Sequence, residues 1–172
     1  PNVFVFDTSF HQTMPAHAYM YAVPYHYYEE MNIRRWGAHG TSHRFVTQRV
    51  CEVLGTQPEN QKIITCHIGN GASVSAVDHG KCIDTSMGLT PLEGLMMGTR
   101  TGDLDASVVL AIMKKEGKTH DEMQDLLNKK SGLLGISGLG SDMRDVENGV
   151  KEGNERAKLA LDMYNYRIKK YI

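Results

Sequence analysis

The chain has 172 residues, enough for one ordinary domain with a sizeable apolar core but not for a second complete one. Its 19 lysines and arginines are balanced by 20 aspartates and glutamates, so no net basic field favours nucleic acid or an anionic membrane. The three cysteines, Cys51, Cys66 and Cys82, have no CxxC spacing and indicate reduced thiols, and no segment resembles a signal peptide or a membrane span. We therefore expect a soluble cytoplasmic protein that binds neither nucleic acid nor membrane.

Hydrophobic periodicity, capping signals and helix breakers divide the chain into strands and helices. Gly55 and Gly117 mark helix ends, and Thr119 with Glu122 has the spacing of a capping box. The mixture of strands and helices predicts an α/β or α+β fold with a mixed sheet flanked by helices. The elements expected in chain order are a buried strand at 3–6, two short helices within 19–31, a helix from 41 or 42 to 54, strands at 62–68, 72–78 and 81–84, helices at 103–116 and 119–127, a buried or ligand-facing loop at 131–140, and a helix capped by residue 154.

A glycine loop, His67-Ile68-Gly69-Asn70-Gly71-Ala72-Ser73, lies at the corner between the first two strands of the 62–84 region. Two glycines one residue apart let backbone amides point at an anion, and Ser73 adds a hydroxyl. The segment matches neither common phosphate-binding glycine motif, and it enters a strand rather than a helix. On these residues alone, a phosphate loop and a tight hairpin are equally supported.

Arg100 stands between Gly98 and Gly102, just before a predicted helix. The flanking glycines allow close approach to a ligand, and the planar guanidinium suits phosphoryl or carboxylate oxygens. Arg100 is therefore the strongest catalytic candidate. In the plainer alternative, Asp103 or Asp105 caps the helix and forms a salt bridge with Arg100.

His39 and His43 lie four residues apart, but Gly40 separates them and no cysteine or acidic third ligand has a useful spacing. This pattern disfavours zinc. We expect His39 to face a ligand, Thr41 or Ser42 to cap the following helix, and His43 to be a helix residue bonded to backbone.

Two further segments have a functional and a plainer interpretation. Asp7 follows the predicted strand at 3–6, a common place for ligand contact, although a lone aspartate there also forms turns. Asp142, Met143 and Arg144 follow the glycine-rich segment, where they could bind a nucleoside or begin a helix. His11 and His17 have no partner pattern and stay unassigned.

Six motifs together resemble those of acetate kinases, in the family's order and spacing and over essentially the whole chain. Propionate kinases share most of them. The chain differs at Ala38, where the family usually has a bulky residue, and at Ala106, where it usually has proline. The motifs are VFDTSFHQTMP, RRWGAHGTSH, HIGNGAS, DTSMGLTPLEGLMMGTRTGDLD, NKKSGLLGISGLGSDMR and YNYRIKKYI.

The resemblance implies a partial actin-like, ribonuclease H-like ATPase fold, in which two similar domains close around ATP. Residues 1–10 would be the last strand of the N-terminal domain, and residues 11–172 most of a C-terminal nucleotide-binding domain truncated at its end. The implied activity is direct in-line phosphoryl transfer from ATP to acetate with Mg²⁺, giving acetyl phosphate and ADP, by a cytoplasmic homodimer.

The resemblance also implies roles for individual residues. Three residues would be catalytic: Asp7, His39 and Arg100. Asp7 would lie near the acetyl group and would contact the metal through water. His39 and Arg100 would contact the transferring phosphoryl. No other metal ligand is assigned within the chain. The ATP phosphates would be held by His67, Ile68, Gly69, Asn70 and Gly71. The adenosine would be held by Asp142, Met143 and Arg144.

By the same resemblance, an asparagine, a second arginine and a magnesium-holding glutamate would lie outside this chain. We therefore expect the isolated chain to be inactive. Two alternatives stay open: a propionate or other short-chain acyl kinase, and a non-catalytic nucleotide-binding or assembly module.

Overall fold

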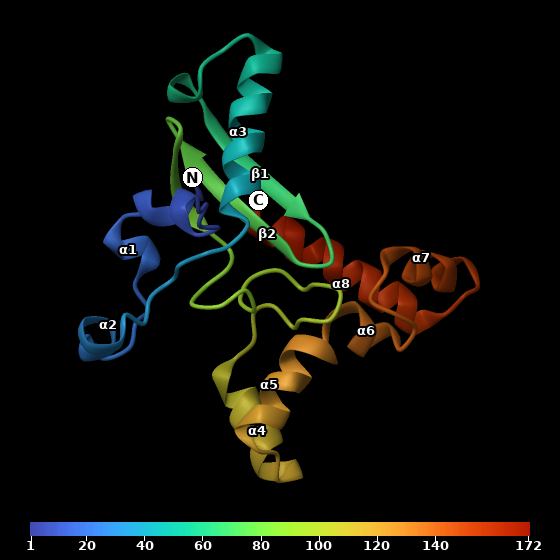
Figure 1. Ribbon diagram of the computed structural model, residues 1–172. Coiled ribbons are helices and arrows are strands. Elements are labelled where there is room, and N and C mark those ends of the chain that lie inside the picture. The colour runs from blue at the N-terminus through green and yellow to red at the C-terminus, as the bar shows by residue number, and fades with distance from the viewer. The chain divides into compact units, whose positions relative to one another are not determined.

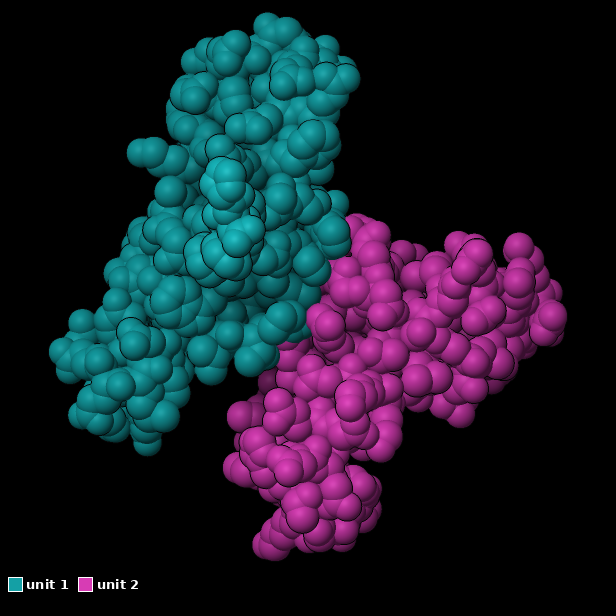
Figure 2. Space-filling view, viewed as in Figure 1, with its two compact units in different colours: residues 1–67, 73–91 teal, residues 68–72, 92–172 magenta.

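The computed structural model describes residues 1–172. The chain forms two compact units, and each is described by itself (Figure 2). The first comprises Pro1–His67 and Ser73–Pro91, and the second comprises Ile68–Ala72 and Leu92–Ile172. Residues Ile68–Ala72 of the glycine loop thus belong to the second unit, whereas His67 and Ser73 belong to the first. None of the helices combines the length and the apolarity needed to span a bilayer.

The first unit contains a three-stranded sheet with the order β1-β2-β3, as the sequence predicts (Figure 1). β2 and β3 pair antiparallel, with Asp78 opposite Lys81 and an irregularity at Ala76/Val77. His79 and Gly80 join them with φ of 50° and 78°, so the tight two-residue turn is also confirmed. The elements are η1 (Ser9–Thr13), α1 (Ala16–Tyr19), α2 (His26–Met31), α3 (Gly40–Leu54), η2 (Pro58–Asn60), β1 (Lys62–Ile68), β2 (Ala72–Asp78) and β3 (Lys81–Thr85).

Helix α3 confirms the predicted helix and its end, because Gly55 adopts φ 65° and closes the last turn. The predicted cap is wrong. His39 occupies the N-cap position, so Thr41 and Ser42 already lie inside the helix. The chain turns into the helix earlier than expected because the Gly40 amide donates to the carbonyl of Asp7, 33 positions before it.

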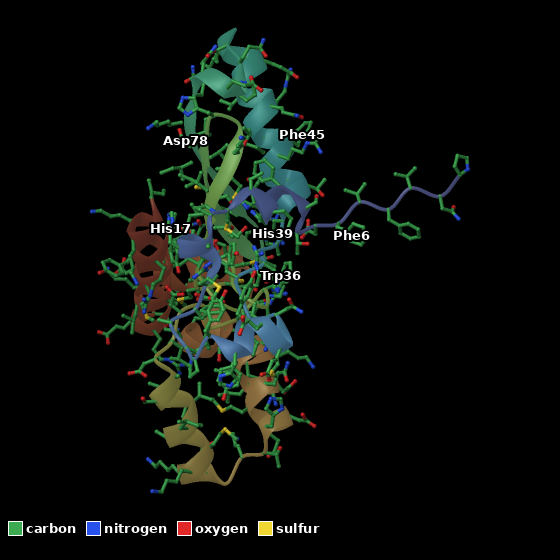
Figure 3. All side chains as sticks on the ribbon, turned by 90° about the vertical axis from the view of Figure 1, so that its left-hand side faces the viewer. Phe6, His17, Trp36, His39, Phe45 and Asp78 are labelled. Carbon is green, nitrogen blue, oxygen red and sulfur yellow. The ribbon has the colours of Figure 1, made fainter.

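The predicted buried strand at residues 3–6 is wrong for this chain. These residues form no strand, and Val3 and Phe6 are 84% and 70% exposed. Figure 3 shows the segment beyond Phe6 extending away from the rest of the first unit. An apolar run becomes a strand only where a sheet edge pairs with its backbone, and none of the three strands pairs with this segment.

The second unit is mainly helical, and its predicted caps are confirmed. Asp105 accepts from the Ser107 amide, Thr119 and Glu122 form the capping box, and Asn154 accepts from the Ala157 amide. The elements are α4 (Ala106–Glu116), α5 (His120–Lys129), α6 (Gly132–Ser137), α7 (Met143–Lys151) and α8 (Glu155–Tyr171).

The segment 131–140, expected to be a loop, contains the short helix α6. Gly132 and Gly138 take φ of 61° and 73° and bracket the helix rather than break it. Burial of Leu133 outweighs the low helix propensity of glycine. The buried core that holds α6, α7 and α8 together consists of Met96, Leu133, Val146, Ala157, Ala160 and Tyr164.

Candidate active site

Asp7 and His39 meet in the first unit although they are far apart in sequence. The Asp7 carboxylate accepts from the His39 amide through Oδ2 at 2.6 Å, and the Asp7 carbonyl accepts from the Gly40 amide at 2.8 Å. A Cβ at residue 40 would overlap the Asp7 carbonyl oxygen, so the close approach requires glycine. Asp7 itself is exposed and lies in the turn before η1, not at a strand end.

The backbone of His39 is strained. Its φ of 59° lies in the left-handed region, which costs a non-glycine residue about 1–3 kcal/mol. The ring stacks on His67 with centroids 4.0 Å apart. Ser42 lies 2.9 Å from Nδ1 of His67, and Ser73 Oγ lies 2.9 Å from Nδ1 of His39. His67, predicted to belong to the phosphate loop, is thus placed beside His39.

His43 is buried, and the prediction that it bonds to backbone is wrong. Its Nδ1 lies 2.7 Å from Thr65 Oγ1, and its Nε2 lies 2.7 Å from Ser73 Oγ. Ser73 is likewise fully buried, so its hydroxyl serves the two imidazoles rather than the glycine loop. These contacts join a side chain of α3 to side chains of β1 and β2, which the local sequence pattern does not reveal.

The previously unassigned His11 is also buried. Its Nε2 lies 2.9 Å from the Ala38 carbonyl, and its Nδ1 lies 3.2 Å from Cys82 Sγ. His17 is exposed on α1. The role of His11 was missed because its partners are distant in sequence. Thr65 was also missed, and Ser73 was assigned to the glycine loop, although a hydroxyl at the inward position of a strand signals a buried partner.

Burial keeps His43 neutral. Desolvation, together with repulsion from the neighbouring histidines, lowers the pKa of His43 from 6.5 to about 3. Desolvation also lowers the pKa of His11, against a smaller opposing effect of its bond to Ala38. Both rings resist protonation at neutral pH.

These pKa values predict how stability depends on pH. Between pH 6.5 and about 3, His43 binds a proton in the unfolded chain but not in the folded one. The unfolded state therefore binds more protons, and we expect the free energy of unfolding to fall as pH drops through this window, with His11 acting in the same direction. Denaturant titrations at pH 6.5 and 5.5 measure the slope.

The matched variants are His43→Gln, which should flatten that slope, and His17→Gln on the exposed face of α1, which should leave it unchanged. An equal slope in the wild type and His43→Gln would contradict the assignment of the pH dependence to His43.

In the second unit, the glycine loop forms one wall of a pocket. The Gly69 amide donates to the Gly71 carbonyl, so the hairpin interpretation is correct for the local structure. The cavity volume of about 570 Å³ lies within the usual range for ligand pockets. Five residues of the two predicted nucleotide segments line it, whereas His67, Gly71 and Arg144 do not. The lining residues are Ile68, Gly69, Asn70, Gly98, Leu133, Ser141, Asp142, Met143 and Tyr164.

Asp142 begins α7, so the helix-start interpretation is also correct. Its Oδ1 accepts from the Arg144 amide at 2.9 Å. Nε of the Arg144 guanidinium donates to both carboxylate oxygens, to Oδ1 at 3.0 Å and to Oδ2 at 3.1 Å. The hydrogen bonds from this guanidinium, and to a smaller extent the hydrogen bond from the Arg144 amide, lower the pKa of Asp142 to about 2. The pocket therefore has an anionic acceptor at one edge.

The main chain around Arg100 is held in place. The Arg100 carbonyl accepts from Met97 at 3.1 Å, and the Thr101 amide donates to the Leu127 carbonyl at 3.1 Å. Gly132 packs so closely that a Cβ there would overlap the carbonyl oxygens of Met97 and Arg100. The loop thus presents Arg100 from a rigid backbone. Asp105 caps helix α4, as expected in the alternative interpretation in which an aspartate after Arg100 begins the helix.

Two further interactions hold the loop that precedes α4. Asp103 accepts from the Gly94 amide at 2.9 Å and from the Tyr171 hydroxyl at 2.7 Å. No group of three or more histidine, cysteine, aspartate or glutamate side chains forms a metal site.

Comparison with solved structures defines the class of the fold. An acetate kinase of Porphyromonas gingivalis is 56% identical with a TM-score of 0.96, covering 97% of this chain and 42% of that one. A propionate kinase of Francisella tularensis is 48% identical with a TM-score of 0.93, covering 97% and 43%. The chain therefore has part of the actin-like ATPase fold of these kinases, as the resemblance implied.

Comparison with sequences gives the family. The model of the acetokinase family matches residues 1–172. Curated acetate kinases of Phocaeicola vulgatus and Thermotoga petrophila are 66% and 64% identical over the whole of this chain and 43% of their own length. The chain belongs to the acetokinase family. It spans less than half the length of these relatives.

Proposed function

We propose that the full-length protein containing this chain transfers a phosphoryl group from ATP to acetate, giving ADP and acetyl phosphate. The observation that carries the proposal is the pocket in the second unit, which joins the loop Ile68–Asn70 to Ser141–Met143 across more than 70 positions. Membership of the acetokinase family supports the reaction. The 66% identity to an acetate kinase supports acetate as the acceptor.

The pocket fits a nucleotide in size and chemistry. Leu133, Met143 and Tyr164 supply apolar and aromatic surface suited to a purine. The anionic Asp142 would accept hydrogen bonds from ribose hydroxyls. In this proposal His67 to Gly71 hold the phosphates and Arg144 completes the adenosine site.

Phosphoryl transfer depends on positioning and on neutralising charge in the transition state. In the proposed in-line mechanism Arg100 binds and stabilises the transferring phosphoryl, and His39 contacts it. Asp7 stands near the acetyl group. The fixed main chain at Arg100 and the Asp7–His39 bond would limit reorganisation during the reaction.

Magnesium would supply positive charge that offsets the negative charge of the phosphates. Mg²⁺ is often held by one or two carboxylates together with waters and substrate phosphates. A single exposed carboxylate, Asp7, fits such a site through water, while its Oδ2 accepts from His39. We also propose that the full-length protein is a cytoplasmic homodimer, as the family resemblance implies.

A hydroxamate assay of the full-length protein with ATP, Mg²⁺ and either acetate or propionate tests the proposal. We expect acetyl phosphate to form with the higher kcat/KM on acetate. Failure to form an acyl phosphate from either acid, while ATP still binds, would support a non-catalytic nucleotide-binding module instead.

A second candidate, a propionate kinase, is favoured by the fold similarity to the Francisella tularensis enzyme. One methylene in an apolar pocket changes the specificity by only about 1–3 kcal/mol. A higher kcat/KM on propionate in the same assay would select this candidate.

A further inference from the structure

A continuous line of hydrogen bonds runs through the first unit to the ring of His39, which Figure 3 labels. It starts at the carbonyl of Ser75, which Thr65 Oγ1 approaches to 3.4 Å, and continues through the 2.7 Å bond between Thr65 and His43 Nδ1. His43 Nε2 then lies 2.7 Å from Ser73 Oγ, which lies 2.9 Å from His39 Nδ1. α3 and the adjoining strands β1 and β2 supply the three linking side chains.

The carbonyl end of this line determines which atoms donate in its first two bonds. A carbonyl oxygen only accepts, so both contacts of Thr65 Oγ1 are satisfied only when its single hydroxyl proton points to Ser75. Thr65 Oγ1 therefore accepts from Nδ1–H of His43. Thr65 and His43 are 2% and 1% exposed, so bulk water does not compete for these bonds.

The next two donors follow from the charge of His43. Because burial lowers its pKa to about 3, the ring is neutral and carries one proton, which is already at Nδ1. Nε2 is then an acceptor, and the fully buried Ser73 hydroxyl donates to it. Ser73 Oγ must accept in its other bond, and the donor is Nδ1–H of His39.

We propose that Thr65, His43 and Ser73 are positioning residues that set the tautomer of His39, holding a proton on Nδ1. In the neutral ring Nε2 is then an acceptor, and it donates a hydrogen bond only when His39 is an imidazolium.

The catalytic consequence rests on the proposed function. Because Ser73 binds the ring at Nδ1, a phosphoryl oxygen would be contacted through Nε2, and the tautomer decides whether the neutral ring can donate a hydrogen bond there. The bond from the His39 amide to Asp7 fixes the backbone at this position, and the contact with Ser73 and the stacking on His67 orient the ring.

Nuclear magnetic resonance of histidine rings reports the tautomer directly. The full-length protein is labelled with ring-¹³C,¹⁵N histidine, the His39 signals are assigned by their loss in His39→Gln, and spectra are recorded at a pH where these signals show the neutral ring. We expect the Nδ1–H tautomer for His39 in the wild type.

Thr65→Val removes the acceptor of the His43 Nδ1 proton without touching His39. Because a buried unpaired donor is unfavourable, the His43 proton should move to Nε2, the Ser73 hydroxyl should turn, and His39 should become the Nε2–H tautomer. Thr65→Ser keeps the hydroxyl and should retain the wild-type signals.

Thr47→Val is the matched control. Thr47 is also buried, but its hydroxyl donates to the main-chain carbonyl of His43 and not to the ring. This variant should leave the His39 tautomer unchanged. An Nε2–H tautomer in the wild type, or the same His39 tautomer in Thr65→Val as in the wild type, would overturn the proposal.

Kinetics test the catalytic consequence separately. We expect Thr65→Val to lower kcat at least about tenfold with little change in KM for ATP, because loss of an outer-shell partner that fixes a tautomer commonly costs this much or more. An unchanged kcat in a variant with the inverted tautomer would overturn that consequence. If the protein forms no acyl phosphate, the proposed function fails while the tautomer result still stands or falls by the spectra.

Discussion

Arg100→Ala in the full-length protein is expected to lower kcat for acetyl phosphate formation by about 100- to 1000-fold. The affinity for ATP should change by less than about tenfold, because the guanidinium acts mainly on the charge that develops in the transition state. The main chain at Arg100 is held by bonds to Met97 and by the packing of Gly132, so truncation of the side chain should leave the loop in place. Steady-state kinetics and calorimetric ATP binding measure the two quantities.

Arg49→Ala is the matched control, since Arg49 is a 61% exposed arginine on α3 paired with Glu52. Surface pairs of this kind contribute little, about 0–1 kcal/mol, and activity should be unchanged. Equal losses of kcat and of ATP affinity in Arg100→Ala would instead make Arg100 a ground-state binder of the nucleotide.

The purified 172-residue chain should show no measurable acetyl phosphate formation. The chain covers 43% of the length of its curated relatives, and the family resemblance places an asparagine, a second arginine and a magnesium-holding glutamate outside it. Loss of one such positioned group commonly costs a factor of about 100 to 1000, and the loss of three should bring turnover below detection, although such losses need not multiply.

The hydroxamate assay on the chain, with the full-length protein at equal concentration as the control, measures this effect. Circular dichroism of the same sample establishes that the chain is folded. Turnover within about tenfold of the full-length protein would show that residues 1–172 contain a complete catalytic centre.

The parts of the fold that could be predicted from sequence are those set by neighbouring residues. The three strands follow from their apolar and β-branched runs and from the turn at His79 and Gly80, and the caps at Asp105, Thr119 and Asn154 follow from side-chain bonds within three positions. The errors involve longer range. The segment 3–6 has the pattern of a strand but no partner in this chain, and the start of α3 depends on the distant carbonyl of Asp7.

The candidate site shows the same division. Arg100 between its glycines and the glycine loop were recognisable as residue types suited to phosphate. The placement of Ser73 and His43 was not, because their partners come from other elements and become visible only when α3 packs on the sheet. The pocket similarly depends on contact between segments more than 70 positions apart.

Hydrogen exchange of the full-length protein with and without a non-hydrolysable ATP analogue and Mg²⁺ tests the central claim that the pocket in the second unit holds the nucleotide. We predict slower amide exchange on nucleotide binding in peptides covering residues 68–72 and 141–144, and no change in peptides covering residues 48–59, which line separate cavities in the first unit. Unchanged exchange at 68–72 and 141–144, with nucleotide-dependent protection elsewhere, would contradict the account.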